Sequence, residues 1–523
     1  MEDRKKQPLL SPTDIDDQLA VQRSPSQHYF AQTLSNHSFT SSFVADGDDI
    51  APISGVAHFF KEFNVESRKL WYLAGPAMFT SICQYSLGAV TQTFAGHIGT
   101  LELAAFTIEN TVIAGLSFGV MWGMGSALET LCGQAYGAGQ VDMLGVYMQR
   151  SWIILLATSL VLTLLYVFAQ PILLLLAQEK EISRVAAQFS LWMIPQLYAY
   201  ALNFPISKFL QAQSKMMAMA WISVIGLVLH VFFSWLFMLR LGWGMGGGLL
   251  VLNVSWWFIV VAQLVYIFSG TCGRAWSGFT WLAFHNLGSF LKLSMASAVM
   301  LCLEMWYYTA LVLFAGYLKN AEVAVDALSI CLNILGWTIM LSLGLNAAVS
   351  VRVSNELGAA HPRTAKFSMV VVVIIAFIIS LFISATILIT QKQYPSIFTE
   401  SPSVKQVVYE LTPLLAFCVV VNNVQPALSG VAIGAGWQAL VAYVNIACYY
   451  IFGIPLGLLM GYTLKMGVKG IWIGMITGTV VQTLCLFWMV YKTNWNKEAS
   501  VAAERIKTWG GEAETKANAQ LVK

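Results

Sequence analysis

The chain is 523 residues long, and 57% of its residues are apolar while only 11% are charged. Ordinary soluble domains carry about a quarter charged residues, so a soluble globule could not cover this apolar content with polar surface. The 29 Lys and Arg nearly balance the 26 Asp and Glu and are scattered along the chain, which leaves no basic face for nucleic acid. Length and composition together predict a polytopic protein of the lipid bilayer.

Cysteines and histidines give no indication of a metal site or a disulfide framework. The eight cysteines form no Cys-x-x-Cys pair and lie nearly all in apolar runs, as small core residues do. No two of the seven histidines are close together in the sequence. We therefore expect no metal, no cofactor and no enzymatic activity.

Apolar stretches dominate the chain after a polar start. Residues 1–65 are rich in Ser, Asp and Gln and lack an apolar run of signal-peptide length, so they predict a disordered tail. From Trp71 onward, stretches of about 20 residues recur, each long enough to cross a hydrocarbon core of ~30 Å as a helix. Twelve spans are predicted: 71–94, 104–128, 146–168, 186–206, 217–239, 246–268, 290–315, 328–349, 368–390, 407–428, 438–460 and 469–491.

The two halves of the chain match when one is shifted by about 220 residues, which indicates an internal duplication. Gly123 and Gly137 correspond to Gly344 and Gly358 at an offset of 221. Each repeat holds six spans, an even number, so both enter the membrane in the same sense. The predicted fold is an all-α membrane protein of twelve transmembrane helices, in two six-helix lobes related by a pseudo-two-fold axis along the membrane normal.

An even number of spans also places both termini on one side of the membrane. Basic residues flank the first and last spans on that side and favour the cytoplasm; they are Lys61, Arg68, Lys69, Lys492, Lys497 and Arg505. The predicted organisation is a cytoplasmic N-tail 1–65, an N-lobe 66–270, a linker 271–289, a C-lobe 290–491 and a cytoplasmic C-tail 492–523.

Glu304 is the polar residue whose position in the membrane is the least favourable in free energy. It lies near the middle of the seventh predicted span, and no cation occurs in that span. An ionised acid there is unfavourable by several kcal/mol, so Glu304 should be protonated part of the time, as a proton carrier would be. Tyr307 and Tyr308, at i+3 and i+4, share its face and can supply hydroxyls, so both are predicted to line the substrate cavity. The alternative is a structural acid hydrogen-bonded to a neighbouring helix.

Further polar residues lie within the predicted spans. Asn422, Asn423 and Gln425 fall within one turn of the tenth span, where they either line a wet substrate cavity or bridge helices. Glu109 in the second span is placed either in the cavity or at the membrane interface. Prolines within spans remove a backbone hydrogen bond and permit a bend. The hinge candidates are Pro76, Pro195 and Pro413.

Two polar segments, 129–139 and 352–363, follow spans two and eight and occupy equivalent places in the repeats. Glu129, Arg352 and Glu356 are the candidate residues of an inner gate. Arg352 and Glu356 are spaced i, i+4 and can pair with each other at a helix end. The alternative pairs Glu129 with Arg352 across the lobe interface.

Several motifs resemble the plant branch of the multidrug and toxic compound extrusion (MATE) transporters, the detoxification proteins. The resemblance extends over residues 60–510. It is carried by ETLCGQAYGAGQ at 129–140, MIPQ at 193–196, KFLQAQ at 208–213, MLCLE at 300–304, VRVSNELG at 351–358 and LSGVAIGAGWQ at 428–438.

The resemblance implies twelve helices in two lobes and antiport driven by protons or sodium, without ATP. It also implies that Glu304, the acid of the seventh helix, takes the coupling proton. Some members carry a second acid in the tenth helix, where this chain has Asn422. Some related members conduct anions, so the substrate is not inherited from the motifs.

The predicted function is a secondary active transporter. It performs proton-coupled antiport of small organic solutes, such as xenobiotics, flavonoid-type or other secondary metabolites and organic anions, by alternating access. We expect a monomer in the vacuolar membrane or, second, the plasma membrane. The alternative is an anion channel or weakly coupled anion transporter, which Asn422 favours. No phosphate-binding loop is present for an ATP-driven pump, and the Gly-x-x-x-Asp-Arg loop of the major facilitator fold is absent.

Overall fold

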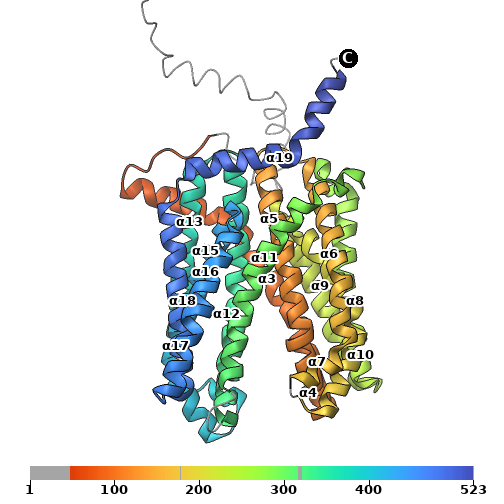
Figure 1. Ribbon diagram of the computed structural model, residues 1–523, viewed down its shortest axis with the longest axis vertical. Coiled ribbons are helices and arrows are strands. Elements are labelled where there is room, and N and C mark those ends of the chain that lie inside the picture. Colours follow the sequence, from red (N-terminus) through yellow and green to blue (C-terminus); the bar gives the residue numbers. More distant parts are fainter. Residues whose placement is uncertain (1–47, 177, 316–320, 522–523) are drawn as a thin grey trace, which may run out of the picture. The chain divides into compact units, whose positions relative to one another are not determined.

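The structure is a computed structural model that describes residues 48–176, 178–315 and 321–521 (Figure 1). The described residues from Asp49 onward form one compact unit. The described residues are helices joined by short connections, and no strand occurs among them. This agrees with the all-α class predicted from composition, because only helices satisfy every backbone polar group within a single span.

In the described part of the chain, twelve helical spans cross the bundle, and each predicted span falls on one of them. Ten are long and apolar enough to cross a membrane by length and composition. The other two, α3 and α8, are 43 and 33 residues long and mix apolar with polar side chains. In chain order the spans are α3 (Val56–Ile98), α4 to α5 (Thr100–Gly137), α6 (Met143–Val167), α8 (Lys180–Ala212), α9 with η2 (Met216–Arg240), α10 with η3 (Gly244–Thr271), α11 (Leu287–Ala315), α12 (Ala321–Gly358), α13 (Pro362–Ile389), α15 (Pro402–Ala435), α16 to η7 (Gln438–Thr463) and α18 (Gly467–Lys492).

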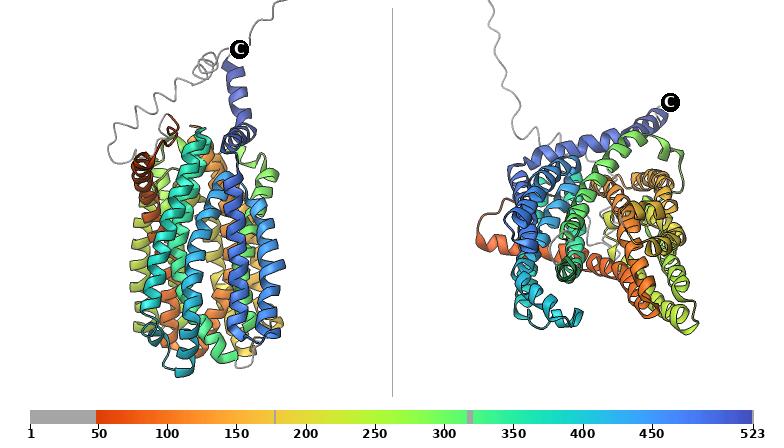
Figure 2. Two further views of the ribbon diagram at one scale, coloured as in Figure 1. Left: turned by 90° about the vertical axis from the view of Figure 1, so that its left-hand side faces the viewer. Right: turned by 60° about the horizontal axis from the view of Figure 1, so that its bottom comes forward.

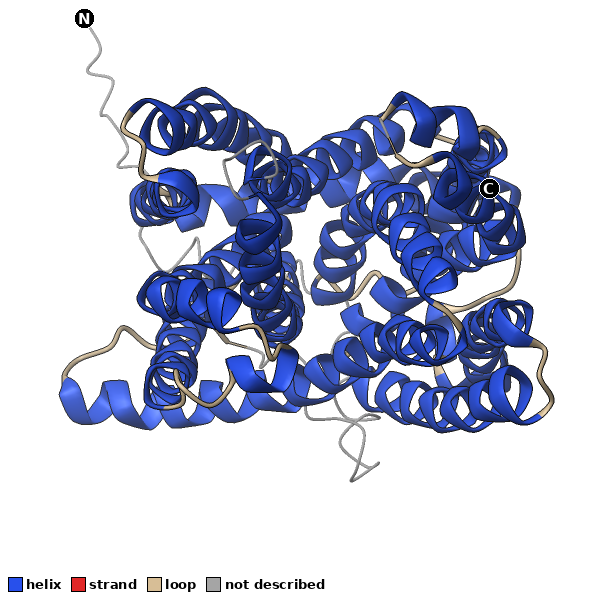
Figure 3. Cartoon of the chain, turned by 90° about the horizontal axis from the view of Figure 1, so that it is seen from below, coloured by secondary structure: helices blue, strands red, loops and turns tan. Residues whose placement is uncertain are grey.

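The spans form two six-helix lobes. The first six pack with one another as the N-lobe and the last six as the C-lobe. Figure 3 shows the bundle from below, along the helices. Residues between α10 and α11 form two short 3₁₀ helices, η4 (Gly273–Ala275) and η5 (Trp281–Phe284). The lobes meet mainly where α5 packs on α11 and α12, and where α3 packs on α12.

Contacts between the lobes obey the two-fold symmetry that the repeat predicts. A Cβ atom at Gly123 would lie 2.6 Å from the Cα of Ala298, and one at Gly344 would lie 2.6 Å from the backbone nitrogen of Met78. The repeat offset relates Gly123 to Gly344 (221 residues) and Met78 to Ala298 (220 residues). Each contact is therefore the symmetry mate of the other, as at an isologous interface.

The same relation holds at the ends of α5 and α12. Gly137 lies against the backbone of Asn355, and Gly358 lies against the backbone of Gln134, each so closely that a Cβ atom would overlap the partner. An offset of 221 converts one pair into the other. We call this end of the bundle the tail side, because Asp49 and the C-terminal helix also lie there (Figures 1 and 2).

The two tails differ from their predicted form. Residues 56–65, expected in a disordered tail, form the first turns of α3. The expected polar C-tail contains α19 (Trp495–Leu521), which lies across the tail-side ends of the bundle (Figures 1 and 2). Residues 1–47 lie outside the described residues. Burial of apolar side chains on one side of α19, discussed below, is the physical reason that this polar segment is helical.

Gly123→Ala should lower the free energy of unfolding by about 1–3 kcal/mol, because the added methyl overpacks the α5–α11 contact. The matched control is Gly88→Ala in α3, where nothing lies within 4 Å of the added atom. That change should be neutral or slightly stabilising, since Ala is the better helix former. Thermal denaturation in detergent measures both; equal melting temperatures would contradict the close-packing argument.

Candidate functional site

Glu304 lies on α11 inside the C-lobe and is half-buried. The side chain of Gln425 on α15 lies near its carboxyl group. One turn along α11, the Tyr308 hydroxyl donates to Oδ1 of Asn422 at 2.5 Å. Among the described residues Glu304 has no ion pair, so its neighbours are neutral hydrogen-bonding groups.

The amides of α15 divide between two roles. Nε2 of Gln425 donates to the Ser429 hydroxyl at 3.0 Å, and Nδ2 of Asn422 donates to the Cys418 sulfur at 3.0 Å, so both are held by their own helix. Asn423 instead accepts from the Ser342 hydroxyl on α12. Asn422, through Tyr308 on α11, and Asn423, through Ser342 on α12, therefore both bridge helices, and Asn422 and Gln425 also form the polar surroundings of Glu304.

Tyr307 is not part of these surroundings, although the sequence placed it in the substrate cavity. It is fully buried, and its hydroxyl donates to the Met475 carbonyl on α18 at 2.7 Å. Its ring stacks on Tyr449 with centroids 4.3 Å apart. Three residues after Glu304, the Tyr307 ring packs between α11, η6 (Ile446–Gly453) and α18. Four residues after Glu304, Tyr308 faces α15.

Glu109 belongs to the interior of the N-lobe and not to the Glu304 cluster. It opens a π-helical turn, η1 (Glu109–Ile113), and its side chain is buried. Tyr166 on α6 and Tyr200 on α8 lie near it, and its Oε1 atom has no hydrogen-bond partner in the described residues. Glu109 therefore faces the inside of its lobe and not the outer surface of the bundle.

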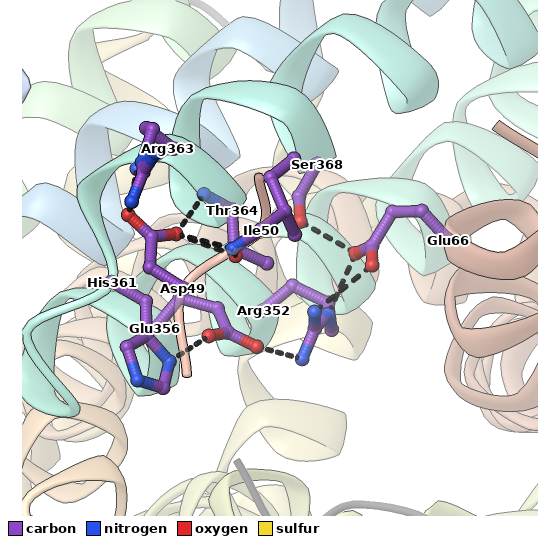
Figure 4. Close-up of polar contacts among 9 residues, drawn as sticks. All are labelled: Asp49, Ile50, Glu66, Arg352, Glu356, His361, Arg363, Thr364 and Ser368. Atoms are coloured by element: carbon purple, nitrogen blue, oxygen red, sulfur yellow. Dashed lines mark hydrogen bonds and ion pairs between the residues drawn. The ribbon is translucent and has the colours of Figure 1, made fainter. Parts of the chain in front are cut away.

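The tail side is closed by a buried ion-pair network between the lobes (Figure 4). Glu66 on α3 receives two hydrogen bonds from Arg352 on α12, at 2.8 Å from Nε and 3.0 Å from Nη2. Arg352 also pairs with Glu356 at 2.5 Å, and Glu356 contacts His361 at 2.9 Å. The predicted i, i+4 pair of Arg352 and Glu356 is confirmed, and Glu66 extends it from the C-lobe to the N-lobe.

The alternative pairing of Glu129 with Arg352 is wrong. Oε2 of Glu129 lies 2.6 Å from Nζ of Lys208, and both side chains are buried. These residues lie on α5 and α8, so their ion pair is internal to the N-lobe. Lys208 lies in the last two turns of α8 and is buried, and a buried cation requires an opposite charge nearby.

Asp49 fixes the described start of the chain to the N-terminus of α13. Arg363 and Thr364 donate four hydrogen bonds to its carboxylate, including both backbone N–H groups at 3.1 and 2.9 Å. Burial raises the pKa of Asp49, but these hydrogen bonds outweigh it and hold the pKa below its ordinary value. This contact is fully present above about pH 4 and is lost as the pH falls through the lowered pKa.

The three hinge candidates lie inside long helices. Pro76 is in α3, Pro195 in α8 and Pro413 in α15. Each helix continues on both sides of its proline, and the Thr80 hydroxyl donates to the Pro76 carbonyl at 2.8 Å. A hinge role for these residues stays a prediction.

Together, two helical lobes, a polar site inside one of them and a closed tail side describe a polytopic membrane transporter. The MatE family model matches residues 76–236 and 296–459, so the chain belongs to the MATE family of transporters. It is 64% identical to Protein DETOXIFICATION 31 of Arabidopsis thaliana over 97% of both chains. It is 66% identical to Protein DETOXIFICATION 29 of the same plant over 89% of this chain and 93% of that one.

A solved structure of the same family has a similar fold. The crystal structure of the eukaryotic MATE transporter AtDTX14 matches with a TM-score of 0.81 at 35% identity, over 85% of this chain and 99% of that one. The twelve-helix, two-lobe prediction and the resemblance to plant MATE transporters are confirmed by these matches.

Glu66→Gln should lower the free energy of unfolding by about 3 kcal/mol, because it breaks a buried ion pair while Arg352 keeps Glu356. Arg363→Gln is the comparison: this cation is half-exposed in its pair with Asp49, and its loss should be below about 1 kcal/mol. Thermal denaturation of both variants in detergent measures the two losses of stability. A larger loss for Arg363→Gln would mean that the buried pair does not hold the lobes together.

Proposed function

We propose that this transporter performs proton-coupled antiport of small organic solutes by alternating access, with Glu304 as the proton carrier. The observation that supports it is an acid inside the C-lobe whose neighbours are neutral. Because no cation fixes its charge among the described residues, a change of protonation is not opposed by the loss of an ion pair.

The neighbours of Glu304 suit both protonation states. The Gln425 amide has a donor and an acceptor, so it can serve a carboxylate or a carboxylic acid. Tyr308 and Asn422 are joined to each other and form the adjacent wall. An ionised Glu304 among these uncharged groups attracts either a proton or a polar solute, and competition for the same group couples the two fluxes.

Transport further requires that the two sides open in turn. We propose the N-lobe 66–270, the linker 271–289 and the C-lobe 290–491 as the moving units, with Pro76, Pro195 and Pro413 as bending points. The ion pair of Arg352 with Glu66 and Glu356 closes the cytoplasmic side, and Glu129 stabilises the N-lobe there through Lys208. Both tails face the cytoplasm, and a monomer acts in the vacuolar membrane or, second, the plasma membrane.

Glu304→Gln should abolish solute uptake driven by a pH gradient in proteoliposomes, because an amide cannot release a proton, while folding and insertion are retained. Glu410→Gln is the matched control, since this acid of the same lobe is exposed and paired with Lys469. Uptake by that variant should equal the wild type. Undiminished pH-driven uptake by Glu304→Gln would remove the assignment.

The same preparation separates the antiporter from an anion channel. Asn422→Asp keeps the oxygen that accepts from Tyr308 and adds a second acid beside Glu304. Because two interacting acids titrate as a pair, the rate of exchange should depend more steeply on pH. In a channel, a fixed negative charge would depress anion current wherever it is ionised. If the reversal potential of the wild-type current does not shift when a pH gradient is imposed, the channel is favoured.

The cytoplasmic placement of the tails is tested at Asn36, which lies outside the described residues. Asn36-His37-Ser38 is a glycosylation acceptor only if the N-tail is lumenal. We expect no modification when the protein is expressed in plant cells. A mass shift on glycosidase treatment that disappears in Asn36→Gln would reverse the topology.

A further inference from the structure

Helix α19 is docked on the body of the protein and is not a free tail. Over residues 495–509, where side chains are described, its buried residues are Trp495, Ala499, Ala502 and Ile506, at helical spacings of four, three and four. It packs against α5, α12 and α13, so it contacts elements of both lobes. A connection of two residues, Thr493 and Asn494, joins it to α18.

Aromatic side chains fix α19 at two points along its length. At its start, the Trp437 indole donates to Oε2 of Glu498 at 3.0 Å, and the rings of Trp437 and Trp495 are 6.1 Å apart. Further on, the ring of Trp509 meets that of Phe290 on α11 at 6.0 Å. These contacts hold the helix across the tail side.

Arg505 connects the two lobes between these points. Its Nη1 atom donates to Oε1 of Gln134 on α5 at 2.9 Å, and to the Ala435 carbonyl at the end of α15 at 3.3 Å. Gly436 has a positive φ of 83°, and a Cβ atom there would lie 2.6 Å from Nη1, so glycine leaves room for the guanidinium. One cation thus bonds an oxygen of the N-lobe and an oxygen of the C-lobe.

The oxygens that Arg505 joins belong to the interface that must separate when the tail side opens. Beneath it, Nε2 of Gln134 donates to the Gly434 carbonyl at 3.1 Å, and the Thr130 hydroxyl donates to the Ile433 carbonyl at 2.5 Å. Both of these hydrogen bonds, from Gln134 and from Thr130, join α5 to the end of α15. Moving α5 away from α15 therefore breaks at least one of the two Arg505 hydrogen bonds, whichever lobe α19 follows.

We propose that α19 is a clamp on the tail side, and that the contact of Arg505 with both lobes holds this side closed. The proposal concerns the opening of the tail side and does not depend on which ion or solute is transported. Releasing the clamp shifts the population toward the state that is open on the tail side. A hydrogen bond from a charged donor is stronger than a neutral one, which is why a single side chain has a measurable effect.

The test measures access to the closed interface. Ser354 on α12 is fully buried and faces Gly133 of α5, so Ser354→Cys reports opening through its rate of reaction with a maleimide. Purified protein in detergent is used without substrate. The parent protein provides the background, since seven of its eight cysteines are buried and Cys485 is partly buried.

Adding Arg505→Ala to Ser354→Cys should raise the labelling rate of the introduced thiol about tenfold, which corresponds to ~1.4 kcal/mol in the opening equilibrium. Lys507→Ala is the matched control, because it removes the same charge from an exposed position two residues further along α19. Its rate should equal that of Ser354→Cys alone. Equal rates for Arg505→Ala and Lys507→Ala, whether raised or unchanged, would overturn the proposal.

A second variant ends the chain at Asn494 and so removes all contacts of α19. It should label at least as fast as Arg505→Ala, provided that both elute as the wild type does in size-exclusion chromatography. Slower labelling than in the full-length chain would overturn the clamp. Glu304→Gln, which tests the proposed transport function, should leave the effect of Arg505→Ala on labelling unchanged.

Discussion

The close approach of α5 and α12 at the pseudo-two-fold axis is the constraint on which the rest of the structure depends. Gly137 and Gly358 let each helix contact the backbone of the other, and Gly123 and Gly344 do the same against α11 and α3. Such contacts leave no room for a side chain, so they fix the relative position of the lobes. The ion pairs, the α5–α15 hydrogen bonds and the docking surface of α19 all follow from that position.

The buried ion pair at the tail side determines which side chains meet between the lobes more than it adds to the free energy of unfolding. Taking Glu66 and Arg352 out of water is unfavourable, and their attraction roughly offsets that loss only while the bidentate geometry is kept. Such an ion pair is stable while the interface is closed. When the interface opens, water replaces the lost attraction by hydrating both charged groups. Glu129 and Lys208 have the same chemistry within one lobe, where no such exchange is required.

The two lobes share a backbone pattern but differ in the polar groups they enclose. In the C-lobe, Glu304 lies among the amides and hydroxyls of α11 and α15. In the N-lobe, Glu109 lies in a π-helical turn near two tyrosines. Duplication thus produced a symmetric frame, and the polar groups enclosed by the two halves of that frame differ.

The sequence by itself determined the membrane class, the twelve spans, the two repeats and the position of Glu304 within its helix. Hydrophobic length, repeat offset and helical spacing are local properties, so they can be read without coordinates. Only the tertiary structure decided that Glu129 pairs with Lys208, that Glu66 meets Arg352 and that Tyr307 faces away from Glu304. These partners lie far apart in the chain or depend on which neighbouring helix a side chain meets. The apolar spacing of α19 was visible in the sequence, but its surface on the two lobes exists only in the folded protein.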